Sequence, residues 1–432
     1  MLPADCPPVT VFSGFLGAGK TTLLRHLLGQ AATAGSDGGP ARWAAVVNDV
    51  AAVNIDGAVV AADTAARRAL GASGAAEVVE LGNGCVCCSG SDDLGEAIAR
   101  LAAAGAYEHL WVETSGVADP RGVATLFTRK NPFGRALADQ ARLAALVTVV
   151  DVVALVAEAT RAGAAGGAGA RKEAGSGQRP VFELMLEQIE CADVVVLNQC
   201  DRADAAGETV ARAEALVAGL NPRAEIVRTE HGQLAAEFFT GTIRFEAAAT
   251  LGAARWVREL NRVASGAGGS PGARAGVARL AAKPMSGAGP ARHEREFGLT
   301  SLVYRARPGF DAARLRALFA GGLPRVLRAK GFFWTTENPD EMGFVSLAGG
   351  VVRWETLSVW WTARIDNGRA SLADRPASVV ANWAEPHGDR RQEIVLIGVG
   401  LDEAGLRAAL DACAFDGGAG GSGGTGRAGY SG

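Results

Sequence analysis

The sequence predicts an α/β fold with a mostly parallel sheet, followed by a smaller α+β C-terminal domain. Between residues 9 and 245, short runs rich in Val, Ile and Leu alternate with stretches of helical spacing, which is typical of strands covered on both faces by helices. A glycine-rich turn joins the first strand to the first helix. Beyond residue 297 the order becomes strand, helix and several further strands, which favours a sheet with helices on one face.

The apolar patterns place the elements of the first domain. Strands are expected at 9–12, 43–48, 76–81, 109–113, 145–151, 193–198 and 224–228. Helices are expected at 20–31, 92–104, 120–129, 181–190 and 207–219. Ligands of such sheets bind beyond the carboxyl ends of the strands. Functional residues are therefore expected in the segments that directly follow the strands.

The turn after the first strand, GFLGAGKTT at 14–22, fits the phosphate-loop pattern G-x-x-x-x-G-K-[ST]. Its glycines allow backbone N–H groups to point at phosphate oxygens, and the following helix adds its positive end. Lys20 is expected to reach the β- and γ-phosphates, and Thr21 to offer its hydroxyl to Mg²⁺. A glycine-rich turn with a chance lysine is the alternative, which the flanking strand and helix disfavour. The expected nucleotide-binding residues here are Gly14, Gly17, Ala18, Gly19, Lys20, Thr21 and Thr22.

Two other strand ends carry carboxylates. Asp201, in NQCD at 198–201, can accept hydrogen bonds from the ring N–H and amino group of guanine, which would select guanine over adenine. The alternative for this short motif is an ordinary turn. Glu113 closes an apolar strand, where a carboxylate is costly unless it serves Mg²⁺ or a water. A helix-capping or salt-bridged acid is the alternative for Glu113.

Three cysteines lie within four residues, spelled C-V-C-C at Cys85, Cys87 and Cys88. Their thiolates can converge on one soft or borderline metal such as Zn²⁺, and a tetrahedral site would need one further ligand. An incomplete shell suits a metal that must later leave. Buried structural cysteines and a redox pair are the alternatives. The other four cysteines are isolated and expected to be structural: Cys6, Cys191, Cys200 and Cys413.

Charge and hydropathy exclude two classes of partner. The formal net charge is −3, with no long basic run, so no nucleic-acid partner is expected. The longest apolar stretch, 144–157, is interrupted by Asp151 and too short to span a bilayer. The first strand begins at Val9, which leaves no room for a targeting segment. We therefore expect a cytoplasmic protein without a membrane partner, whose cysteines are reduced.

Glycine-rich stretches suggest the domain boundaries, because such composition buries too little surface to offset chain entropy. We expect a nucleotide domain at 1–245 with a flexible insertion near 162–179, and a helix and flexible linker at 246–296. The C-terminal α+β domain is expected at 297–415, followed by a disordered tail at 416–432.

Taken together, these segments resemble the CobW-type metallochaperone GTPases, a branch of the P-loop GTPases. The chain has five of that family's motifs in order: GFLGAGKTT, NDVAAVNID at 48–56, NGCVCC at 83–88, ETSGVADP at 113–120 and NQCD at 198–201. The second domain also looks like the family's C-terminal domain, in LVYRARPGF at 302–310, RVLRAKGFFW at 325–334 and GDRRQEIVLIGVGLD at 388–402.

The resemblance implies GTP hydrolysis coupled to delivery of a metal, zinc or cobalt, to a client protein, with self-association as a further option. It implies GTP and Mg²⁺ as ligands of the first domain. Lys20, Asp49 and Glu113 would be the catalytic residues, with Asp49 in the first switch and Glu113 in the Mg²⁺ and water region. The base would contact Asn198, Gln199 and Asp201, and the transferred metal would bind Cys85, Cys87 and Cys88.

Three departures from the family pattern leave an alternative open. Ala52 stands where relatives usually carry a Glu that can assist metal binding, and Gln199 replaces the lysine that normally packs over the base. The linker at 264–292, His-rich in many relatives, has no histidine. The alternative is a non-enzymatic metal-binding or buffering protein with a weakened nucleotide site. A P-loop kinase or ATPase is a third hypothesis, which Asp201 disfavours.

Overall fold

The computed structural model describes residues 6–35, 40–48, 76–81, 90–130, 134, 136–168, 172–173, 181–246, 299–321 and 323–414. Several predictions fall outside these residues. They concern Asp49, Ala52, the three clustered cysteines (Cys85, Cys87 and Cys88), the linker expected at 246–296, of which only residue 246 is described, and the tail expected at 416–432.

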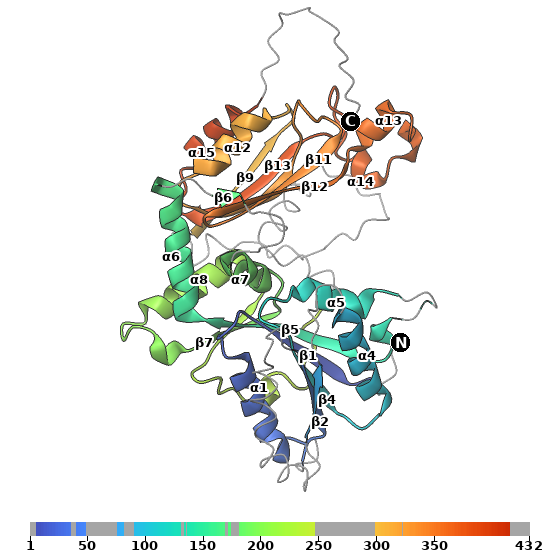
Figure 1. The fold of residues 1–432 in the computed structure, drawn as a ribbon, viewed down its shortest axis with the longest axis vertical. Helices are drawn as coiled ribbons and strands as arrows, with labels where there is room; N and C mark the ends of the chain where they lie inside the picture. The colour runs from blue at the N-terminus through green and yellow to red at the C-terminus, as the bar shows by residue number, and fades with distance from the viewer. Residues whose placement is uncertain are drawn as a thin grey trace, which may run out of the picture.

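The first domain contains a seven-stranded parallel sheet in the order β3-β2-β4-β1-β5-β7-β8 (Figure 1). Its strands are β1 Pro8–Ser13, β2 Trp43–Asn48, β3 Ala76–Leu81, β4 His109–Glu113, β5 Arg142–Asp151, β7 Val194–Asn198 and β8 Glu225–Arg228. The helices are α1 Lys20–Gly29, α4 Gly90–Ala103, α5 Pro120–Thr128, α6 Val152–Ala168, α7 Val181–Glu190 and α8 Glu208–Leu220. The predicted parallel α/β sheet is confirmed.

Both faces of this sheet are covered, because its strands carry apolar residues on both sides. Leu23, Leu24 and Leu27 of α1 pack on one face together with Phe239. Helices α4 and α5 pack on the opposite face over β1, β2 and β4. Helices α6, α7 and α8 continue that layer over β5 and β7. Short 3₁₀ turns complete the domain at Gln30–Ala32, Leu137–Asp139, Cys200–Arg202 and Ala236–Phe238.

The second domain contains a six-stranded sheet in the order β6-β12-β11-β10-β13-β9. Its long strands pair antiparallel: β9 Leu299–Ala306, β10 Val326–Phe333, β11 Glu341–Ala348, β12 Val351–Val359 and β13 Gln392–Val399. Helices α12 Ala312–Gly321 and α15 Glu403–Asp411 pack on one face through Leu315, Phe319 and Leu406. Helices α13 Trp361–Asp366 and α14 Ala377–Val380 lie between β12 and β13 in the chain, with a 3₁₀ turn at Leu372–Asp374. The predicted α+β domain is confirmed.

The expectation of a flexible insertion near 162–179 is wrong for its first part. Residues 162–168 form the last turns of α6, because alanine favours helix and Ala162 is buried next to Gly349 of the second domain. Strand β6, Lys172–Glu173, then pairs in parallel with Val351 and Val352 of β12. Figure 1 shows α6 rising from the first sheet to the second. This part of the chain therefore connects the two domains.

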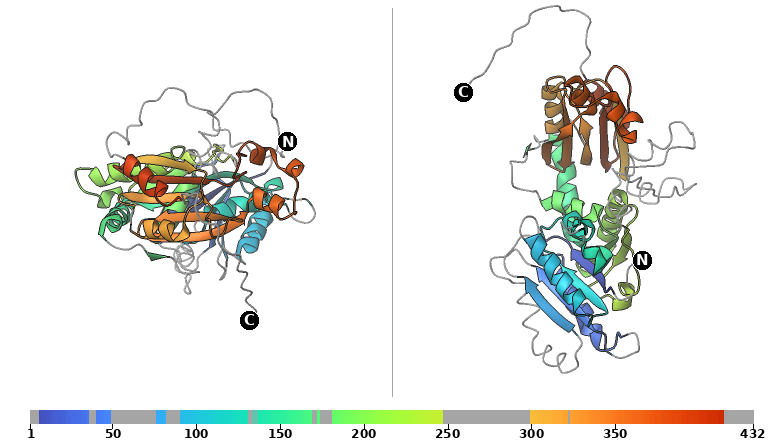
Figure 2. Two further views of the ribbon diagram at one scale, coloured as in Figure 1. Left: turned by 90° about the horizontal axis from the view of Figure 1, so that it is seen from above. Right: turned by 90° about the vertical axis from the view of Figure 1, so that its right-hand side faces the viewer.

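One apolar cluster joins the two domains. It combines residues of α6, α7 and α8 with Leu299, Leu327, Val395 and Ile397 of the second sheet. The contact is tight, since a Cβ on Gly219 of α8 would lie 1.7 Å from the Leu299 side chain. Figure 2 shows the two sheets one above the other along the long axis of the molecule. Among the described residues, no helix is both long and apolar enough to cross a bilayer.

Candidate nucleotide site

The phosphate loop connects β1 to α1, and its backbone requires glycine at two crowded positions. Gly14, Gly17 and Gly19 have φ values of 135°, 78° and 98°, which side chains rarely adopt. A Cβ on Gly14 would lie 2.1 Å from the carbonyl oxygen of Val149, and one on Gly19 would lie 2.2 Å from Nδ2 of Asn198. The loop therefore packs between β5 and the last residue of β7.

The loop presents a positive site. Helix α1 begins at Lys20 after Gly19, which provides no side-chain cap for the first helical N–H groups. Such a helix end favours an anion through its N–H groups and dipole. The Lys20 side chain is only 4% exposed, and its ammonium donates to the Phe15 carbonyl at 3.5 Å. The Lys20 side chain therefore packs against the phosphate loop.

Two oxygen ligands meet at the mouth of this loop. Glu113 ends β4, which pairs with β1, and it is 1% exposed. Thr21 Oγ1 donates to Glu113 Oε1 at 2.7 Å. The alternative of a helix cap for Glu113 is wrong, because Asp119 caps α5 by accepting from the Arg121 N–H. A hydroxyl and a carboxylate at this position fit Mg²⁺, which prefers oxygen ligands.

The segment after β7 is tied to the phosphate loop. Asn198 Nδ2 donates to the Ala18 carbonyl and Gln199 Nε2 donates to the Gly17 carbonyl, both at 2.8 Å. Asn198 Oδ1 accepts from the Gly232 N–H at 3.1 Å, so it also holds the loop after β8. The amide of Gln199 therefore contacts the phosphate loop although the family's lysine is missing.

The structure adds His231, which lies in the segment after β8. Its Nε2 lies 3.8 Å from Asp201 Oδ2, and its φ of 53° belongs to the left-handed region. The rule that functional residues follow parallel strands could have found it, since β8 ends three residues earlier. Asp201 and His231 together form a polar rim next to Gln199.

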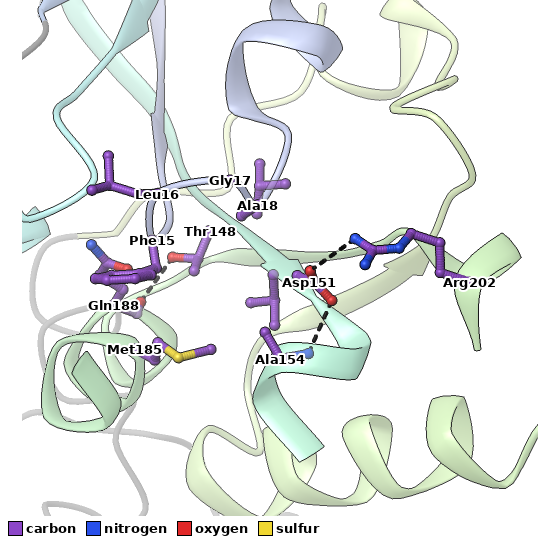
Figure 3. Close-up of a pocket in the computed structure, with 12 residues that line it drawn as sticks. Phe15, Leu16, Gly17, Ala18, Thr148, Asp151, Ala154, Met185, Gln188 and Arg202 are labelled. Carbon is purple, nitrogen blue, oxygen red and sulfur yellow. Dashed lines mark hydrogen bonds and ion pairs between the residues drawn. The ribbon is translucent and has the colours of Figure 1, made fainter. Parts of the chain in front are cut away.

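A cavity of about 230 Å³ extends along the phosphate loop on the side of α7. Phe15 and Leu16 line it from the loop, Asp151 from the end of β5, and Met185 and Gln188 from α7 (Figure 3). Arg202 reaches Asp151 across its far end, at 3.6 Å. Helix α7 therefore borders the phosphate loop as well as the second domain.

The predicted metal ligands, Cys85, Cys87 and Cys88, and the predicted switch residue Asp49 are outside the described residues. The strands that lead into their segments are described. β2 ends at Asn48 and β3 at Leu81, which pair in register, and Val47 of β2 pairs with Glu113. Both strands therefore end at the sheet edge that holds Glu113. In the described part of the chain, no group of three or more His, Cys, Asp or Glu residues could hold a metal.

Fold and site together define a P-loop nucleotide-binding protein. Residues 8–228 match the model of the CobW/HypB/UreG nucleotide-binding domain, and residues 299–414 match the cobalamin synthesis protein cobW C-terminal domain. The chain belongs to this family.

Named relatives come from a eukaryote and from bacteria. The chain is 29% identical to zinc-regulated GTPase metalloprotein activator 1 of Dictyostelium discoideum, over 94% of this chain and 79% of that protein. It is 34% identical to the zinc chaperone CobW of Pseudomonas aeruginosa, over 52% of this chain and 57% of that protein. The Zn(II)-bound YjiA GTPase from E. coli aligns over 94% of this chain and 99% of that one, at 18% identity and a TM-score of 0.36.

Proposed function

We propose that this protein is a GTP-hydrolysing metallochaperone that binds a transition metal and delivers it to a client protein. The observation that carries the proposal is the bond between Thr21 and Glu113 at the phosphate loop that holds Lys20, in a member of this family. The relatives' names, a zinc chaperone and a zinc-regulated GTPase metalloprotein activator, support zinc as the metal.

In this proposal, the first domain binds the phosphates of GTP. The backbone N–H groups of the glycine loop and of the first turn of α1 would donate hydrogen bonds to the phosphate oxygens. Lys20 would exchange its contact with the Phe15 carbonyl for the β- and γ-phosphates. Thr21 and Glu113 would hold Mg²⁺. When bound, Mg²⁺ neutralises charge that develops on the phosphates.

The base would lie against the segment after β7. Asp201 is at the rim of this segment, with a quarter of its side chain exposed, and its carboxylate can accept from guanine. Asn198 and Gln199 keep that segment in register with the phosphate loop through their bonds to Ala18 and Gly17. The bond from Gln199 supports an intact link between this segment and the phosphate loop.

The transferred metal would bind Cys85, Cys87 and Cys88, whose thiolates suit zinc and also cobalt. The cysteine segment follows β3, and Asp49 follows β2, at the edge where Glu113 ends β4. A change in nucleotide state at that edge can therefore reach both segments. We further propose that the two domains, 1–245 and 297–415, act together on a client in the cytoplasm, where thiols stay reduced.

Asp201→Asn tests the choice of nucleotide. The substitution removes an ionised acceptor of two hydrogen bonds, so we expect GTP to bind about 30- to 150-fold more weakly. Competition between labelled GTP and unlabelled ATP or GTP measures it. Asp204→Asn is the matched control, because Asp204 accepts from the Glu208 and Thr209 N–H groups at the start of α8. The proposal is contradicted if ATP competes as well as GTP for the unchanged protein.

A further inference from the structure

Helix α7 contacts the loop that follows Glu113. This post-β4 loop comprises residues 114–119 and leads from β4 into α5. Gln188 of α7 is 1% exposed, and its Nε2 donates to the carbonyls of Gly116 and Ala118 at 3.1 and 3.3 Å. The backbone of Gln188 is itself fixed, because its carbonyl accepts from Thr148 Oγ1 of β5 at 2.8 Å. One buried side chain therefore holds the loop backbone at two points.

The other side of the post-β4 loop contacts the phosphate loop. A Cβ on Gly116 would lie 2.8 Å from the backbone nitrogen and side chain of Leu16. Thr114 donates to the Phe12 carbonyl through its N–H, at 2.9 Å, and through its hydroxyl, at 3.0 Å. Figure 3 shows Gln188 near Phe15 in the wall of the cavity beside the phosphate loop. The post-β4 loop is thus held between the phosphate loop and α7.

A second face of α7 carries three carboxylates, at helical spacing, that bind cations of the second domain. Glu190 pairs with Arg328 at 3.0 Å and with Lys330 at 3.3 Å, both on β10. Glu183 pairs with Arg353 of β12 at 3.0 Å and accepts from Ser346 of β11 at 3.1 Å. The side chains of Glu190, Arg328 and Lys330 are at most 3% exposed.

The third carboxylate, Glu187, is shared between the domains. It lies 3.5 Å from Lys330 Nζ and 3.4 Å from a guanidinium nitrogen of Arg121. Arg121 is in the first turn of α5, directly after the post-β4 loop, and its N–H bonds to the cap Asp119. The second sheet, α7 and the end of the post-β4 loop are therefore joined by one set of charges, of which Arg121 is partly exposed.

These charges depend on one another. Burial raises the pKa of Glu190, but Arg328 and Lys330 outweigh burial and hold it at about 2. Removal of one partner would leave a buried charge uncompensated, which destabilises a fold strongly. These ion pairs therefore fix the position of α7 relative to the second sheet.

We propose that Gln188 is a positioning residue for GTP hydrolysis, and that the C-terminal sheet sets the position of α7 through Glu187 and Glu190. This inference rests on the proposed GTPase function. The C-terminal domain lies on the far side of α7 from the phosphate loop (Figure 1), yet it contributes to the rate. A client that binds the C-terminal domain can then regulate hydrolysis through α7.

Gln188→Met in the full chain tests the positioning role, because methionine keeps the volume and removes the donor. We expect kcat for GTP to fall about 10-fold or more while KM changes less than about 2-fold, the pattern of an interaction made in the transition state. Gln392→Met is the matched control. Gln392 of β13 is also fully buried, and its amide donates to two carbonyls outside α7, of Pro308 and Trp334, at 2.8 and 3.0 Å. The control should lower Tm and leave kcat unchanged.

Lys330→Met tests the contribution of the C-terminal sheet, and Lys330→Arg should preserve it. We expect Lys330→Met to lower kcat about 3- to 10-fold, and the double variant with Gln188→Met to be no slower than Gln188→Met alone, since coupled residues are non-additive. If the loss of kcat in the double variant equals the product of the two single losses, the role of the C-terminal sheet is overturned. An unchanged kcat in Gln188→Met, or an equal loss of kcat in Gln392→Met, would overturn the positioning role alone. An unchanged protein that fails to hydrolyse GTP would overturn the proposed function as well.

Discussion

Replacement of Lys20 by alanine is expected to slow GTP hydrolysis by about 10²–10³-fold, because a preorganised donor to the developing phosphate charge is lost. The structure supports this size of effect. Lys20 is 4% exposed and follows the left-handed Gly19 at the uncapped start of α1. Phosphate release under saturating GTP measures the loss.

Lys130→Ala is the control for this variant, because Lys130 is an exposed lysine beyond the end of α5. It should hydrolyse GTP at the rate of the unchanged protein. Wild-type turnover in Lys20→Ala would show that the phosphate loop is not the site of hydrolysis. Equal losses of the GTP hydrolysis rate in both variants would show that the loss in Lys20→Ala does not arise from the phosphate loop.

Substitution of Cys85, Cys87 and Cys88 by serine together is expected to abolish stoichiometric zinc binding, because serine does not supply a thiolate to a soft site. The isolated cysteines are not expected to replace these three as zinc ligands. Burial raises the pKa of Cys191 to about 12, and burial also raises the pKa of Cys200 and Cys413, so these thiols stay protonated at neutral pH.

The control for the cysteine variant is the double substitution Cys200→Ser and Cys413→Ser, which should retain one zinc per chain. Metal content after dialysis against a weak chelator gives the stoichiometry of both proteins. One tightly held zinc per chain in the triple variant would refute the assignment of the metal to the C-V-C-C segment.

Much of the first domain could be predicted because its signals are local. The glycines of the phosphate loop are dictated by backbone geometry, and Gly14 and Gly19 do have positive φ and crowded surroundings. Buried parallel strands appear in the sequence as apolar runs, and the seven predicted strands are present within a few residues. The convergence of Thr21 with Glu113 followed from placing strand ends at one edge.

Features that depend on distant partners could not be predicted. Strand β10 has no clear strand pattern in the sequence, because Arg328 and Lys330 interrupt its apolar residues, and their partner Glu190 lies on another element. The three glutamates of α7 suggest a solvated face, yet all are buried against the second domain. The end of α6 is rich in glycine, and its packing near Gly349 depends on a residue far along the chain.

Position 199 contributes to the nucleotide site in two ways, through the stem over the base and through a bond to the phosphate loop. The missing lysine stem predicts weaker GTP binding. The structure shows that the Gln199 amide still bonds the Gly17 carbonyl. The link between the base segment and the phosphate loop is therefore kept, and the affinity for GTP stays a prediction.

Equilibrium dialysis of zinc against the protein loaded with a non-hydrolysable GTP analogue or with GDP tests the central claim, that nucleotide state controls metal binding. If the two states are coupled through the sheet edge that holds Glu113, the zinc affinities should differ by about 5- to 150-fold, the usual range for coupled sites. Equal zinc affinities in the two nucleotide states would contradict the account.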